Sequence, residues 1–166
     1  MKKKVLVLLV VAILAITPAM AANSKGASED GSVGIGLNLG TNTGLGLKFG
    51  MGKFDIFANV GLSFLNGYGL GADVGVSYEV YDIDLGGKHH MPVTVGLMAP
   101  VEMNWNPFYL SVSALVHAGL EYQIPDVPVL FYLRLGLGAK FNILKADDAK
   151  FVDFTGSGAL GVLYVF

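Results

Sequence analysis

Apolar and polar residues alternate along nearly the whole chain after residue 32. In the segment 33–41, Val33, Ile35, Leu37 and Leu39 fall on one side of an extended chain, with glycine or asparagine at the positions between them. A period of two indicates a strand, because successive side chains of a strand point to opposite faces. The alternation recurs along the chain and predicts eight strands, at 33–41, 45–51, 54–64, 70–80, 92–103, 108–124, 129–143 and 151–166.

Short connections separate these segments, and they contain the residues that favour turns. Glycine after asparagine or before lysine favours a tight hairpin, and proline cannot continue a hydrogen-bonded ladder. Connections of this length predict that consecutive strands are antiparallel neighbours. We expect them at 41–43, 52–53, 66–67, 82–90, 104–107, 125–128 and 145–150.

The two faces of the expected sheet differ in chemistry. One face carries nearly all the large aliphatic and aromatic side chains, whereas the other is largely glycine, serine, threonine and asparagine. A closed sheet of eight strands has an interior only wide enough for packed side chains or one small ligand, so the bulky apolar face belongs outside. Only hydrocarbon makes such an exterior stable. The sequence therefore predicts an all-β fold, an eight-stranded antiparallel up-and-down transmembrane β-barrel spanning 32–166.

Aromatic residues gather where these strands begin and end, as the interfacial girdles of membrane barrels do. Strands of roughly 9 to 11 residues cross a bilayer when tilted, and all the predicted strands except 45–51 reach that length. The aromatics at strand ends are Phe49, Phe64, Tyr122, Phe141, Tyr164 and Phe166, and those at strand starts are Phe54, Phe108, Phe131 and Phe154.

The first 21 residues have the three parts of a cleavable secretory signal peptide. Three lysines precede an apolar run at 5–16, and Ala19-Met20-Ala21 supplies a site with small residues for cleavage. The run of 12 residues is shorter than the roughly 18 that a membrane-spanning helix needs. We therefore expect export, with a flexible lead-in at 22–31 before the barrel.

Composition narrows the function classes. The chain has no cysteine, so it folds without disulfides and carries no lipid-attached cysteine. Over half of its residues are hydrophobic and 14% are charged. Removing the leader takes away three of the 11 basic residues and none of the 13 acidic ones, so the mature chain is acidic. We expect no nucleic-acid partner, and the sequence indicates no cofactor.

The last six residues carry a resemblance. Gly161, Tyr164 and Phe166 form an alternating strand with a glycine, an aromatic residue and a terminal phenylalanine, with Ala159 where a polar residue often stands. This tail resembles the C-terminal assembly signal of outer-membrane β-barrel proteins. The chain is similar in plan to small eight-stranded bacterial outer-membrane β-barrel proteins such as the transmembrane domain of outer membrane protein A and outer membrane proteins X and W.

The resemblance implies a location and partners but no specific activity. It implies a multi-pass barrel in the bacterial outer membrane, surrounded by outer-membrane lipids. It also implies contact with periplasmic chaperones and the barrel-assembly machinery during biogenesis.

The inward face of the expected barrel carries charged residues and a histidine. Arg134 is expected diagonally close to Glu121, and Lys140 nearly opposite Asp153. Buried charges are tolerable only with partners, so we interpret these residues as ion pairs that fill a sealed lumen; a polar channel or a gated plug is the alternative. The set is Lys48, Asp55, Asp73, Glu79, Glu102, His117, Glu121, Arg134, Lys140 and Asp153.

Two other groups of residues invite a chemical interpretation. His117, with Glu121 and Ser113, invites comparison with the eight-stranded lipid A deacylases, whose catalytic histidine precedes a serine by two positions; here that position is glycine. Residues four apart on a strand are also roughly 13 Å apart, so we expect no enzyme activity. The connection 82–90 holds two aspartates and two histidines that could bind a metal, but we interpret it as a solvated turn.

Two functions remain open at this point. The first is a structural or surface-interacting membrane barrel with a largely plugged lumen, and the second is a small channel or transporter for hydrophobic or small ionic solutes. A lipid-modifying enzyme is a third and weaker hypothesis. Trp105 is expected at an outer loop, as an interfacial anchor or a contact for a partner.

Overall fold

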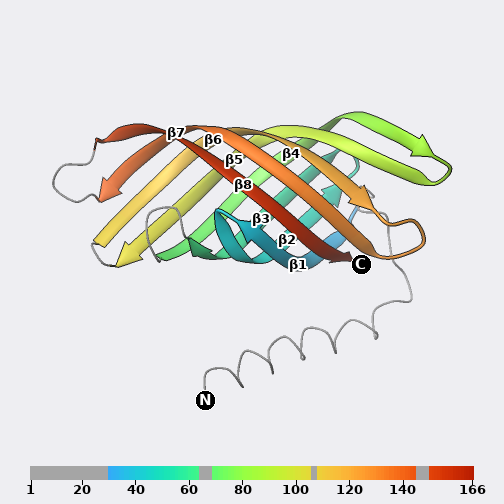
Figure 1. The fold of residues 1–166 in the computed structure, drawn as a ribbon, viewed down its shortest axis with the longest axis horizontal. Coiled ribbons are helices and arrows are strands. Elements are labelled where there is room, and N and C mark those ends of the chain that lie inside the picture. Colours follow the sequence, from blue (N-terminus) through green and yellow to red (C-terminus); the bar gives the residue numbers. More distant parts are fainter. Residues whose placement is uncertain (1–29, 64–68, 106–107, 145–149) are drawn as a thin grey trace, which may run out of the picture.

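The strands close into a ring in which each is hydrogen-bonded to its neighbours in sequence and the last returns to the first (Figure 1). The computed structural model describes residues 30–63, 69–105, 108–144 and 150–166. Within these ranges all neighbouring strands are antiparallel, which confirms the all-β, eight-stranded, up-and-down prediction. The strands are β1 Val33–Gly40, β2 Asn42–Met51, β3 Phe54–Ser63, β4 Gly69–Gly86, β5 His89–Trp105, β6 Phe108–Gln123, β7 Val129–Leu144 and β8 Val152–Val165.

The register together with burial shows which face of the sheet points inward. Leu37 of β1 lies opposite Leu45 of β2 and Val162 of β8, and paired residues share a face of the sheet. Leu37 is 59% exposed, whereas the next residue, Asn38, is 1% exposed. Leu135 and the preceding residue, Arg134, differ in the same way, with 59% and 2% of their surfaces exposed. The ring therefore has an apolar exterior and a largely polar interior.

Both described termini lie at one end of the barrel, which we call the terminal end. Phe166 N donates a hydrogen bond to Val33 O at 2.8 Å. The turn at 52–53, the hairpin between β4 and β5, and the connection 124–128 lie at this end. We call the opposite end, where β1, β3, β5 and β7 finish, the far end.

One predicted connection is wrong, because the segment 82–90 is mostly strand. β4 continues to Gly86 and β5 begins at His89, with Asp84 paired to His90. Charged residues on both faces indicated a loop, but this hairpin extends past the neighbouring strands, as Figure 1 shows, so both faces meet solvent. Only Gly87 and Lys88 lie in the turn itself, and the positive φ angles of Gly86 and Gly87, 97° and 66°, suit glycine.

Other boundaries shift by smaller amounts. Asn42, expected in a turn, is the first residue of β2, so β2 has 10 residues and β1, with 8, is the shortest strand of the described ring. Trp105, expected in a loop, is the last residue of β5. The expected signal peptide 1–21, most of the lead-in 22–31, the turn at 66–67 and most of the loop 145–150 lie outside the described residues.

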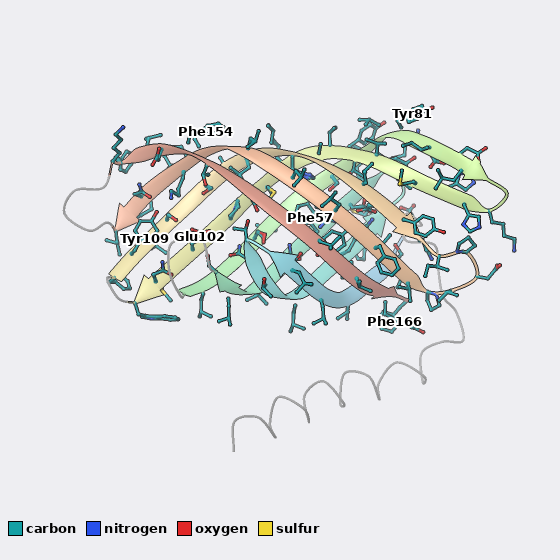
Figure 2. All side chains as sticks on the ribbon, in the orientation of Figure 1. Phe57, Tyr81, Glu102, Tyr109, Phe154 and Phe166 are labelled. Carbon is teal, nitrogen blue, oxygen red and sulfur yellow. The ribbon has the colours of Figure 1, made fainter. Side chains whose placement is uncertain are left out.

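Apolar side chains fill two places inside the ring. Phe57, Met98 and Leu115 form one cluster at mid-barrel, where Figure 2 labels Phe57. The second cluster, toward the terminal end, contains Leu130, Tyr132, Ala159, Leu163 and Val165.

Gly161, a residue of the tail that resembles an assembly signal, has a packing role here. A Cβ atom at this position would overlap ring atoms of Tyr132, so the missing side chain leaves the space that the buried tyrosine occupies. Gly158, on the same strand, differs because its Cβ would make only an ordinary contact of 3.5 Å with Leu135.

We predict that Gly161→Ala destabilises the barrel even when it is folded in detergent without any assembly machinery. Overpacking of this kind typically costs about 1–3 kcal/mol, whereas Gly158→Ala should change the free energy of unfolding little. Denaturant unfolding of the two purified variants measures the difference. Equal free energies of unfolding for Gly161→Ala and Gly158→Ala would mean that the packing of Tyr132 does not need the space left by Gly161.

Candidate functional site

Four charged side chains from four strands meet inside the barrel, and they form what we call the charge cluster. Lys48 of β2 contacts Glu121 of β6, and its Nζ lies 3.1 Å from Asp55 Oδ2. Arg134 Nη2 of β7 lies 3.1 Å from Glu121 Oε1, as the sequence predicted. All four are at most 3% exposed, and their charges balance. Because β2 and β6 stand on opposite sides of the ring, the Lys48–Glu121 pair crosses the lumen.

Aromatic rings hold the Arg134 guanidinium on two sides. Its Cζ lies 3.9 Å from the ring centroid of Phe57 and 4.3 Å from that of Tyr132. A cation over an aromatic face is attracted to the ring, more strongly where water is excluded. Phe57 also meets the His117 ring edge-on at 5.3 Å. The cluster therefore continues directly into the apolar residues at mid-barrel.

A second crossing of the lumen is made by neutral polar side chains and the Asp73 carboxylate, which together we call the amide network. The Tyr132 hydroxyl of β7 donates to Asn38 Oδ1 of β1 at 2.7 Å and lies 3.4 Å from Asn59 Oδ1 of β3. Asn59 Nδ2 donates to the Asp73 carboxylate at 3.4 Å, and Asn42 Nδ2 donates to it at 3.3 Å. These contacts tie β1, β2, β3, β4 and β7 together across the interior.

The position of His117 depends on the glycine at 96, which leaves room for its ring, rather than on a neighbouring acid. Its Nε2 lies 3.1 Å from Val76 O of β4, reaching across Gly96 of β5. A Cβ on Gly96 would lie 2.6 Å from this nitrogen. Glu121, the acid considered beside His117, instead binds Lys48 and Arg134. The geometry therefore gives no support to a catalytic pair, and the absence of enzyme activity stays a prediction.

The remaining predicted lumen residues do not join the charge cluster. Asp73 belongs to the amide network, and Glu102 is 5% exposed toward the far end. Lys140 and Asp153 are register partners, as expected, but Lys140 is half-buried and Asp153 is exposed. Glu79 is half-buried beside a bulge at the terminal end. Within the described ranges, the buried ion pairs of Lys48, Asp55, Glu121 and Arg134 therefore lie at one level of the lumen.

Sequence reasoning identified the charges but not the neutral groups that connect them. Alternation placed Asn38, Asn59 and Phe57 on the inward face, and Tyr132 opposite the apolar face of β7. Nothing in the alternation shows which inward residues of distant strands meet. Gly161 is the feature of the sequence that could have indicated one of these contacts. An inward glycine leaves space for a large inward side chain on a neighbouring strand, which here is Tyr132.

The polar side chains of the hairpin between β4 and β5 form separate pairwise contacts. His90 Nδ1 lies 2.8 Å from Asp82 Oδ2, Lys88 Nζ lies 3.0 Å from Asp126 Oδ1, and His89 Nδ1 lies 2.7 Å from the Tyr122 hydroxyl. In the described ranges, no group of three or more histidine, cysteine, aspartate or glutamate side chains could hold a metal ion.

Comparisons with known proteins found no matching family model, no matching curated protein and no matching solved structure. No helix in the described part of the chain is long and apolar enough to cross a membrane. The site must therefore be understood from its own geometry. That geometry is a closed interior crossed by an ion-pair cluster, an apolar cluster and an amide network.

We predict that Lys48→Met destabilises the folded barrel strongly. The change leaves two buried carboxylates with one remaining cation, and removing one partner of a buried pair typically costs about 3–5 kcal/mol. The matched control is Lys88→Met, because the Lys88–Asp126 pair is exposed and exposed pairs contribute about 0–1 kcal/mol. Denaturant unfolding in detergent measures both, and similar losses would contradict a structural role for the charge cluster.

Proposed function

We propose that the chain is an integral β-barrel of the bacterial outer membrane with a structural or surface-interacting role and a largely plugged polar lumen. The proposal rests on the ring having an apolar exterior and a polar interior, which is the reverse of a soluble barrel. Soluble monomers rarely expose apolar patches larger than a few hundred Å², but here large apolar side chains such as Leu47, Val74, Leu97 and Leu135 are exposed around the ring. Hydrocarbon is the solvent that stabilises such an exterior.

Aromatic residues at both ends of the barrel support the same proposal. At the terminal end, Phe54 lies 4.7 Å from Tyr78, and Tyr164 lies 4.8 Å from Phe166, measured between ring centroids. Phe154 is 74% exposed at the far end, and Figure 2 shows Phe154 and Phe166 toward opposite ends. Two aromatic bands separated by aliphatic residues suit the two interfaces of a bilayer.

The ends of the sequence support export and assembly. The leader 1–21 directs the chain across the inner membrane, and the tail that ends at Tyr164 and Phe166 engages the barrel-assembly machinery after periplasmic chaperones deliver the chain. The proposed partners in the mature state are outer-membrane lipids. Both termini then face the periplasm, and the far end faces the outside.

A small channel or transporter is the second candidate, and the buried charges favour it because they line a polar interior. Two crossings of the lumen and the Phe57–Met98–Leu115 cluster weigh against an open path. Eight strands also leave an interior that packed side chains fill. We therefore favour the plugged barrel.

We predict that the full-length mature chain folds into lipid vesicles, migrates differently on gels before and after boiling, and gives little or no steady conductance. Vesicle flotation and planar-bilayer recording measure the two properties. A chain that folds as a β-rich monomer in buffer and does not float with vesicles would contradict the membrane location. Insertion with stable channels of uniform conductance would instead support the transporter.

A further inference from the structure

The hairpin between β4 and β5 has one strand edge that no neighbouring strand covers (Figure 1). β3 pairs with β4 only as far as Tyr78, and Glu79 N then donates to Lys53 O at 2.9 Å. Beyond Glu79, no backbone hydrogen bond between described residues joins β4 to any segment except β5. Residues 80–86, which we call the free edge, are exposed apart from the half-buried Ile83.

The other edge of the hairpin is held against the barrel. Pro92 of β5 has no amide hydrogen, and the pairing of β5 with β6 begins one residue later. Past that point, His89 Nδ1 lies 2.7 Å from the Tyr122 hydroxyl, and Lys88 Nζ lies 3.0 Å from Asp126 Oδ1. These contacts support the hairpin from the β5 side and leave the β4 side open.

The backbone groups of two aspartates point to the free edge. In an antiparallel ladder, pairs that exchange hydrogen bonds alternate with pairs whose backbone groups point away from each other. Glu79 donates away from its partner Thr94, so this pair is of the second kind. Pro92 is two residues from Thr94 on β5, so its pair with Asp82 is of the second kind too. The N–H and C=O groups of Asp82, and of Asp84 two residues on, therefore point away from β5.

The side chains of the free edge differ between the two faces of the hairpin. Tyr81 and Ile83 lie opposite outward residues of β5, and Tyr81 is 65% exposed near the hairpin in Figure 2. Asp82 and Asp84 lie on the other face, where His90 Nδ1 is 2.8 Å from Asp82 Oδ2. A strand added here would meet acidic side chains at alternate positions on one face and apolar side chains on the other.

We propose that the free edge binds an extended polypeptide segment by strand addition, and that this segment carries lysine or arginine at alternate positions. An uncovered edge is a template for another strand, and main-chain hydrogen bonds supply the affinity in this mode of recognition. Side chains directly opposite Asp82 and Asp84 supply the specificity, because opposite charges on neighbouring strands attract.

A second copy of the chain fits the free edge poorly. Antiparallel pairing of two free edges would set Asp82 or Asp84 of one copy opposite an aspartate of the other, since paired residues share a face. Like charges directly opposite each other destabilise a sheet. The charge pattern therefore favours a basic partner over self-association.

Only the location of the partner rests on the proposed function, in which the terminal end faces the periplasm. Membrane barrels usually have short turns on that side, and joining β4 to β5 does not require a hairpin that reaches past the neighbouring strands. The partner is then a segment of a periplasmic polypeptide.

The test uses residues 22–166, labelled with ¹⁵N and folded in a zwitterionic detergent. The probe is an acetylated and amidated fluorescent peptide of about seven residues, long enough to cover the edge, in which lysine alternates with threonine or valine. We expect saturable binding by fluorescence anisotropy. Hydrogen exchange of the Asp82 and Asp84 amides should slow with peptide, whereas the Ile83 amide, which points to β5, should keep its rate.

Two changes separate the charge from the backbone contribution. The double variant Asp82→Asn and Asp84→Asn should weaken the affinity by about threefold or more at low salt, with a smaller difference at high salt. Its control is Asp126→Asn, an exposed acid on the other edge, which should bind like the parent. A peptide with N-methyl groups on alternate residues keeps its charge but loses the amide donors that face the edge, so it should not bind.

Three results would overturn the proposal: no saturable binding at millimolar peptide, equal binding of the N-methylated peptide, or unchanged affinity in the double variant. Slower exchange at Asp82 and Asp84 that depends on barrel concentration without peptide would assign the edge to a second copy instead. Slower exchange with lipid vesicles alone would assign it to a membrane surface. Because peptide binding is measured in detergent, its failure is distinct from a failure to float with vesicles.

Discussion

The narrowness of an eight-stranded ring is the constraint on which the rest of the structure depends. Side chains that point inward must fill the space, and opposite walls are close enough for residues of β2 and β6 to touch. Most bulky apolar residues consequently point outward, and outside the two apolar clusters the inward positions are glycine, small polar residues or long side chains that reach across. Each inward charge needs a partner because little water remains to solvate it. The contacts of Lys48 and Arg134 with Glu121 supply such partners, and the Lys48–Glu121 contact also links opposite sides of the ring.

The lumen divides into levels of different chemistry. The charge cluster has balanced charges and lies beside the apolar residues at mid-barrel, so it resembles a sealed structural core. Toward the far end the inward side chains are mainly oxygen donors, with Asp73 and Glu102 as the buried acids.

Alternation was enough to predict the facing of most described strand residues, because a register slip of one would have turned the whole apolar set of a strand into an interior too narrow to hold it. The Arg134–Glu121 and Lys140–Asp153 neighbours also followed from the turn positions. Alternation could not show that Lys48 meets Glu121 or that Tyr132 meets Asn38, since those contacts depend on closure of the ring. The β4–β5 hairpin was missed because an extension with both faces in solvent loses the apolar signal that marks a strand.

A fluorescent probe on the outer face of the barrel can test whether that face contacts lipid. Because the chain has no cysteine, a single introduced cysteine carries the probe at one chosen position. Leu135, outward and mid-strand on β7, and Lys150, exposed before β8, are the matched positions. For barrels folded into vesicles, we expect brominated acyl chains to quench the probe on Leu135→Cys, whereas iodide in the buffer should quench the probe on Lys150→Cys. Strong iodide quenching at Leu135→Cys without quenching by the brominated lipid would contradict a lipid-facing exterior.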